Sequence, residues 1–396
     1  MISQRELFLR HVAPTSDMPL ALEIERAEGV YLYDTKGRKY IDLISGISVS
    51  NLGHGHPKVL EAVNSQMKKH AHLMVYGEYV QYPQVKLAEK LTFLLPEKLN
   101  CVYFTNSGTE ATEGAMKLCK RASGRTQIIS FRNSYHGSTQ GALSIMGSEE
   151  FKTSFRPLLP DTLQLDYNSF ESLVQITQKT AAVFVEVIQA ESGIQKAKQE
   201  WLQHLRQKCD ETGTLLVFDE IQTGFGRTGK LFAFEHYQVI PDVLLVGKAF
   251  GGGLPLGAFI SSHQLMQELT HQPVLGHITT FGGNPVCCAA GLASLETLLK
   301  EGWMQSVDQK NKMLSQFNDF SSTEFRSFGL MAALNFTSPE FNMAAIRKVI
   351  AKGVITDWFL FNASAMRIAP PLIISDQELK EAVEIISETI QQLPSS

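Results

Sequence analysis

Short apolar runs alternate with amphipathic stretches through the middle of the chain, from about residue 100 to about residue 260. The apolar runs lie at residues 101–104, 127–131, 181–185, 215–218 and 243–246. Their length and their β-branched residues predict strands that are buried on both faces. Between them, apolar residues recur at helical spacing, as at Ala111, Ala115, Leu118 and Cys119. This alternation predicts an α/β fold whose mostly parallel sheet is covered by helices on both faces.

The two ends of the chain have a different pattern. Apolar segments 29–33 and 39–43 flank residues 34–37, whose turn-forming composition predicts a hairpin. Pro57 then favours the first position of a helix. The apolar face of that helix would comprise Val59, Leu60, Val63 and Met67. After about residue 290, longer helices alternate with short strands, and a capping box at 375–378 opens the last helix.

Composition and charge narrow the class of protein. The chain has 396 residues, of which 44% are hydrophobic and 19% charged, with a net charge of −4. This is typical of a globular protein with two or three core-forming units, and neither nucleic acid nor a membrane surface is an expected partner. The amino end lacks a signal-peptide core, and no apolar run is long enough to span a bilayer. The five cysteines show no metal spacing, so we expect reduced thiols in a cytoplasmic protein.

A lysine follows one of the buried runs. The run 243–246 leads to Gly247 and Lys248, and three glycines follow at 251–253. The glycines let the backbone lie close against a flat ligand. A lysine at a buried strand end suits an amine that must lose its proton and attack a carbonyl. The alternative is a solvated lysine at the entrance to a loop.

Two further strand ends carry polar groups. The run 215–218 continues into Asp219, and Gln222 comes three residues later. Parallel strands would present this acid and Lys248 at the same sheet edge, where open α/β sheets bind ligands. Residues 105–111 connect a predicted strand to a helix and contain two hydroxyls and a glycine, a pattern suited to a phosphate. The alternative there is ordinary helix capping by Thr109.

Two other motifs do not carry the chemistry that they suggest. His54 and His56 are separated by one residue, but no third ligand is near, so no metal site is expected. Residues 224–230 match most of a P-loop, but Leu231 stands where a magnesium-binding hydroxyl is required. This excludes a nucleotide triphosphatase.

The segments 219–229 and 246–258 together resemble the class III aminotransferases, the ornithine and ω-amino acid type, and the similarity continues over nearly the whole chain. These proteins are fold-type I enzymes that use pyridoxal 5′-phosphate. The resemblance implies a large domain over residues 51–290, with a mostly parallel seven-stranded sheet. It also implies a smaller α+β domain over residues 291–396, with which residues 1–50 pack.

The resemblance also assigns roles around the cofactor. Lys248 would form its Schiff base and carry the proton during transfer, while Asp219 would face the pyridine nitrogen and favour its protonated form. Gln222 would contact the ring hydroxyl, and Tyr135 would stack on the ring. The remaining cofactor-binding residues would be Ser107, Gly108 and Thr109 at the phosphate, His136 as a supporting residue, and Glu186.

Other assignments concern the substrate and the partner subunit. Arg367 would clamp the substrate carboxylate in bidentate fashion, and Glu191 would pair with that arginine when a substrate binds the other way round. Thr280 would reach the phosphate of a neighbouring subunit, which implies a homodimer with active sites at the interface. Ser138 replaces an arginine that usually holds a second carboxylate in ornithine-, acetylornithine- and aminobutyrate-type relatives. The resemblance therefore does not extend to 2-oxoglutarate as acceptor or to ornithine-like donors.

The predicted function is transfer of an amino group from an amino acid or ω-amine to a 2-oxo acid, with ping-pong kinetics. One alternative is an aminomutase or decarboxylase of the same fold, which would need no separate keto acceptor. Another is a non-enzymatic protein that senses the cofactor or has a structural role.

Overall fold

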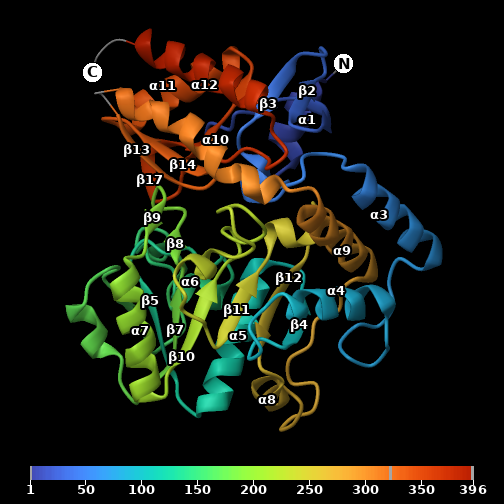
Figure 1. Ribbon diagram of the computed structural model, residues 1–396, viewed down its shortest axis with the longest axis vertical. Helices are drawn as coiled ribbons and strands as arrows, with labels where there is room; N and C mark the ends of the chain where they lie inside the picture. The colour runs from blue at the N-terminus through green and yellow to red at the C-terminus, as the bar shows by residue number, and fades with distance from the viewer. Residues whose placement is uncertain (1, 321–322, 394–396) are drawn as a thin grey trace.

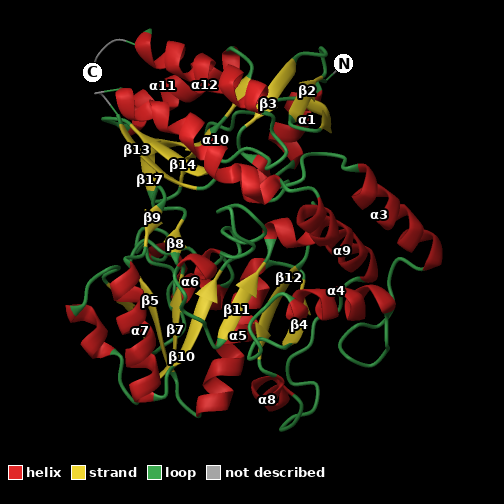
Figure 2. Ribbon diagram, in the orientation of Figure 1, coloured by secondary structure: helices red, strands yellow, loops and turns green. Residues whose placement is uncertain are grey.

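The central element of the protein is a seven-stranded sheet, shown in Figures 1 and 2 by a computed structural model that describes residues 2–320 and 323–393. Its strands in spatial order are β4 (Cys101–Thr105), β12 (Gly257–Ser261), β11 (Val243–Val246), β10 (Leu215–Asp219), β7 (Thr180–Val185), β5 (Gln127–Phe131) and β6 (Thr162–Leu165). Only β12 runs antiparallel to its neighbours within this sheet. The predicted α/β class and mostly parallel sheet are confirmed, although β6 and β12 were not among the predicted runs.

Residues of the central strands alternate between two hydrophobic cores. Leu216, Phe218 and Leu244 belong to the core that contains residues of α7 (Gln199–Thr212). Val217 and Leu245 belong to the core formed with α5 (Gly108–Ser123). Because successive side chains of a strand point to opposite faces, this alternation shows that helices cover both sides of the sheet.

The carboxyl-terminal part forms a second layer above the sheet edge (Figure 1). Its antiparallel sheet has the order β13 (Glu324–Phe328), β14 (Met331–Asn335), β17 (Asn362–Ile368) and β16 (Asp357–Phe359). The accompanying helices are α10 (Val307–Leu314), α11 (Pro339–Ala351) and α12 (Asp376–Gln391). The predicted capping box is present at the start of α12, where Ser375 and Glu378 bond each other's backbone amides.

The amino-terminal segment joins this second layer. After α1 (Gln4–His11) come the antiparallel strands β1 (Ile24–Glu28), β2 (Tyr31–Asp34) and β3 (Lys39–Asp42), and β2 and β3 form the predicted hairpin. Strand β15 (Val354–Ile355) pairs in parallel with β3, so residues from both ends of the chain share one sheet. This pairing fixes the amino-terminal segment against the carboxyl-terminal layer.

A group of three helices leaves apolar side chains exposed to solvent. These helices are α3 (Pro57–Lys69), α4 (Tyr82–Phe93) and α9 (Pro285–Lys300), and the expected domain boundary at residue 290 lies inside α9. Pro57 occupies the first turn of α3, as predicted. Of the predicted apolar face, Val59 and Val63 pack against the core, whereas Leu60 and Met67 are 50% and 53% exposed, so only part of that face is buried within the chain.

Shorter elements connect these layers. They are α2 (Ser45–Ser48), α6 (Gln140–Ser144), α8 (His263–Met266), β8 (Ile188–Gln189) and β9 (Gln195–Lys196). Single 3₁₀ turns lie at Thr153–Phe155, Glu171–Gln175, Ala233–His236, Lys248–Gly251, Gln267–Leu269, Trp303–Ser306 and Ser315–Asp319. None of the helices in the described ranges has both the length and the apolar composition to cross a bilayer. The cytoplasmic location stays a prediction.

Candidate active site

A cavity of about 290 Å³ lies where the strands β5, β7, β10 and β11 end. Its walls come from the loops that follow these strands and from the start of α5. The lining residues are Gly108, Thr109, Tyr135, His136, Gly137, Ser138, Glu186, Asp219, Ile221, Gln222, Thr223 and Lys248. Open α/β sheets bind ligands beyond the carboxyl ends of their strands, so the fold itself favours this cavity as the site.

The start of α5 forms one wall of the cavity. Ser107 is the N-cap, and its hydroxyl accepts a hydrogen bond from Glu110 N at 3.3 Å, so the alternative of capping by Thr109 is wrong. In the described chain, the amides of Gly108 and Thr109 make no hydrogen bond, and both residues line the cavity. A Cβ at Gly108 would lie 2.7 Å from Ile221 Cδ1, so a larger residue there would displace the Ile221 side chain. Free amides at a helix N-terminus attract an anion.

Lys248 follows β11 and lines the same cavity. Its backbone is in a strained conformation, with φ of 48°. Its Nζ donates a hydrogen bond of 2.8 Å to Gln222 Oε1. Loss of hydration lowers the pKa of Lys248 to about 8, and the nearby charges of Glu191 and Arg367 act on it in opposite directions. At pH 7 such a pKa leaves roughly a tenth of the amine unprotonated, against about one in three thousand for an ordinary lysine. The amine is therefore able to act as a nucleophile and a base.

Two buried carboxyl groups face this cavity. Asp219 is 5% exposed, and its oxygens accept from His136 Nδ1 at 2.7 Å and from Ile221 N at 3.0 Å. Glu186 accepts from Tyr135 N at 3.0 Å. Burial and then the charge of Asp219 raise the pKa of Glu186 well above its ordinary value, which favours its neutral form. A neutral Glu186 is thus expected beside Asp219.

Aromatic groups lie around Ser138 at one side of the cavity. The half-buried Tyr135 places its hydroxyl 3.1 Å from Ser138 Oγ. The ring of Phe361, from the turn between β16 and β17, lies 6.4 Å from the ring of Tyr135 and 5.4 Å from that of Phe151. Among the lining residues of the described chain, Lys248 is the only lysine or arginine. Within the described lining, therefore, no second lysine or arginine side chain lies near Ser138.

Arg367 and Glu191 form a buried bidentate pair. Nη1 and Nη2 of Arg367 donate to the two carboxylate oxygens of Glu191, each at 2.9 Å. Burial opposes ionisation of Glu191, but Arg367 outweighs it and leaves the pKa of this carboxyl below its ordinary value. The amide of Phe361 donates to Glu191 O at 3.0 Å, and the ring of Phe361 lies near that of the lining residue Tyr135, so the pair lies beside the cavity.

Thr280 is the one predicted site residue that lies away from this group. It is exposed on the loop before α9 and does not line the cavity. Ile221, Thr223 and Phe361 are neighbours of the site that the sequence did not single out. The first two had a signal, because they alternate with Asp219 and Gln222 in the same short segment, whereas Phe361 arrives from a distant hairpin.

The sequence profile described as Aminotransferase class-III matches residues 12–390. The chain belongs to this family. This class III aminotransferase is 36% identical to the acetylornithine aminotransferase of Methanopyrus kandleri over 386 residues, which cover 96% of the chain and 97% of the relative. It is 34% identical to the LysW-aminoadipate semialdehyde/glutamate semialdehyde transaminase of Sulfolobus acidocaldarius over 380 residues, covering 94% and 95% of the two chains.

Solved structures agree with this assignment. A transaminase from the marine bacterium Virgibacillus superposes with a TM-score of 0.91, at 29% identity and over 98% of each chain. The class III aminotransferase therefore has the fold-type I architecture that the sequence predicted, and its family uses pyridoxal phosphate. The predicted function, amino-group transfer by a class III aminotransferase, is confirmed at this level.

Proposed function

We propose that the cavity of this aminotransferase holds pyridoxal 5′-phosphate, attached covalently through Lys248. The free amides of Gly108 and Thr109, beside Ser107, would hold the phosphate. Asp219 would face the ring nitrogen and Gln222 the ring hydroxyl. The residues fit the group, because an anion site, a buried carboxylate and an amine of lowered pKa line one cavity. That juxtaposition is the observation on which the proposal rests.

Each of these residues has a distinct task. The bound cofactor would withdraw electrons from the substrate carbon that bears the amine. Lys248 Nζ would remove and return the proton at that carbon, which its pKa of about 8 permits near neutral pH. Asp219, held by His136 and by Ile221 N, would keep a fixed negative charge in place. Glu186, as a neutral acid, would add no second negative charge beside that of Asp219.

We further propose a donor that is an amino acid or ω-amine and an acceptor that is a 2-oxo acid with a single carboxylate. Arg367 would bind that carboxylate through the two nitrogens that Glu191 now occupies. The relatives named for acetylornithine are 36% identical, so this donor belongs in any panel. Tyr135, Phe361 and the lining residue Ser138 offer no positive charge for a second carboxylate, which supports pyruvate over 2-oxoglutarate.

The test is a single-turnover experiment on the cofactor-loaded enzyme. With a donor alone, we expect about one equivalent of carbonyl product per active site and then no further reaction, because the amino group stays on the enzyme. Adding pyruvate should restart turnover, and 2-oxoglutarate should be at least about tenfold less effective, given the 1–3 kcal/mol typical of a charged hydrogen bond. Continuous product formation without an acceptor, or release of CO₂, would contradict the proposal.

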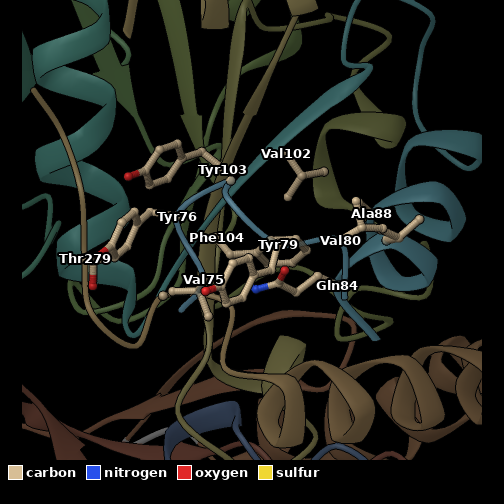
Figure 3. A pocket seen from close by; sticks show the side chains of 13 residues that line it. Val75, Tyr76, Tyr79, Val80, Gln84, Ala88, Val102, Tyr103, Phe104 and Thr279 are labelled. Atoms are coloured by element: carbon tan, nitrogen blue, oxygen red, sulfur yellow. The ribbon is translucent and has the colours of Figure 1, made fainter. Parts of the chain in front are cut away.

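We also propose that the working unit is a homodimer that pairs through the surface of α3 and α4. Exposed apolar and aromatic side chains lie on these helices and on the loops before α4 and α9, namely Leu60, Met67, Tyr79, Val80, Tyr82 and Phe281. Figure 3 shows Tyr79 and Val80 beside Phe104 at a hollow of about 380 Å³ whose wall includes Thr279. The rings of His72 and Phe281 lie 4.7 Å apart in a tilted arrangement, which connects the loop of Thr280 to this surface. A second copy seated here would meet Thr280 directly.

Replacing Val80 with Asp should separate the subunits. Val80 is 94% exposed in the single chain, and a buried unpaired charge costs several kcal/mol at an interface. We expect light scattering to report the mass of one chain and turnover to fall with it, because Thr280 of the partner would be lost. Val174, 70% exposed on the 3₁₀ turn Glu171–Gln175, provides the control, and Val174→Asp should stay dimeric and active. A Val80→Asp variant that stays dimeric would refute this surface.

A further inference from the structure

Arg367 binds a second carboxylate, on a different side from Glu191. Its Nε donates to Asp357 Oδ1 at 2.8 Å, whereas Nη1 and Nη2 point to Glu191. Burial raises the pKa of Asp357 to about 6, although Arg367 acts in the opposite direction. Glu191 receives two hydrogen bonds from Arg367 and a third from Leu360 N at 3.2 Å, and its pKa is lowered. The two carboxylates therefore hold the guanidinium unequally and in different directions.

Strand β16 surrounds the rest of the guanidinium. Nη2 also donates to the carbonyl of Trp358 at 3.0 Å. The ring of Phe359 lies under the guanidinium, with Cζ 4.4 Å from the ring centre. Asp357, Trp358 and Phe359 are consecutive, so one short strand covers the side and the face of the group. The outer edge of the guanidinium is formed by the Nη1 and Nη2 hydrogens that bond Glu191, although Nη2 is shared between Glu191 and Trp358.

The two carboxylates also differ in what carries them. Asp357 and Arg367 are register partners in the antiparallel pair of β16 and β17, so a single sheet fixes their separation. Glu191 comes from the loop after β8, beside the cavity. A carboxylate that arrives from the cavity competes with Glu191 for the outer edge, and it leaves the contact with Asp357 in place.

We propose that Asp357 is a positioning residue, which holds Arg367 through Nε so that its outer edge stays aimed at the cavity while Glu191 and a substrate carboxylate exchange. This inference rests on the proposed role of Arg367 as the carboxylate clamp. A free guanidinium on a long side chain loses rotational freedom when it binds, and prior fixation removes that cost. Asp357 thereby contributes to selection of substrates that carry a carboxylate.

The test compares substrates with and without a carboxylate. Asp357→Ala should raise the KM of the 2-oxo acid at least about tenfold, because Nε loses its acceptor. The rate with 1-phenylethylamine, a donor without a carboxylate, should stay within about twofold in its own half-reaction. Asp357→Asn keeps an oxygen that can accept from Nε, so its KM should return to within about threefold of the parent.

Glu191→Gln should change the KM of the 2-oxo acid in the opposite direction, through the same guanidinium. A weaker competitor should lower the KM of the 2-oxo acid, whereas Asp357→Ala raises it. An unchanged KM in Asp357→Ala, or an equal loss with 1-phenylethylamine, would overturn the inference, and Asp357→Asn decides the case if the alanine variant does not fold. If Arg367→Ala also leaves the KM of the 2-oxo acid unchanged, the proposed clamp itself is wrong.

Discussion

Replacing Lys248 with Ala should lower turnover by about 10⁴-fold or more, because one side chain is lost that is both nucleophile and proton carrier. The side chain contacts Gln222 and lies in a cavity where loss of hydration lowers its pKa to about 8. No other lysine or arginine among the described lining residues can replace it. Steady-state rates with a donor and pyruvate measure the effect.

A second measurement makes this prediction independent of activity. Borohydride should fix the cofactor to the parent chain, and mass spectrometry should find it on Lys248. The alanine variant should gain no such mass, whereas Lys230→Ala, which removes an exposed lysine after β10, should behave like the parent. Cofactor found on another lysine of the parent would show that the site has been assigned to the wrong residue.

Much of this site was predictable because its polar residues interrupt apolar runs. Lys248 and Asp219 each follow a run that is too apolar to lie at the surface, and parallel strands bring such ends together. The same periodicity placed β5, β7, β10 and β11. It did not predict β12, because Gly257 weakens the strand signal. It could not have predicted the antiparallel direction of β12 either, since an apolar run has the same pattern in both directions.

Contacts between distant segments were not predictable. Ser107 and Thr109 can both cap a helix, and only the backbone of α5 distinguishes them. Asp357 meets Arg367 because β16 and β17 adopt one register, which a composition of short strands does not specify. Amphipathic spacing likewise identified Leu60 and Met67 as one face of α3, but not whether the chain itself covers that face.

Asp219→Asn should lower turnover by about 10²- to 10³-fold, the range found when one preorganised electrostatic group is removed. The amide keeps the size of the side chain and can still accept from Ile221 N, so the fold should be preserved. It carries no charge to stabilise a protonated ring nitrogen. The measurement is kcat at saturating donor and acceptor, together with thermal unfolding of the loaded enzyme.

Glu186→Gln is the matched control, because it makes the same chemical change to the other buried carboxyl group of the cavity. Burial and Asp219 raise the pKa of Glu186, so the parent already favours a neutral side chain there. The glutamine variant should therefore keep its turnover within about threefold of the parent. Equal losses in the two variants would mean that the cavity requires the hydrogen-bonding pattern of a carboxyl group at both positions, and not one negative charge. A loss confined to Asp219→Asn would instead show that one negative charge, at one end of the cavity, is what the chemistry requires.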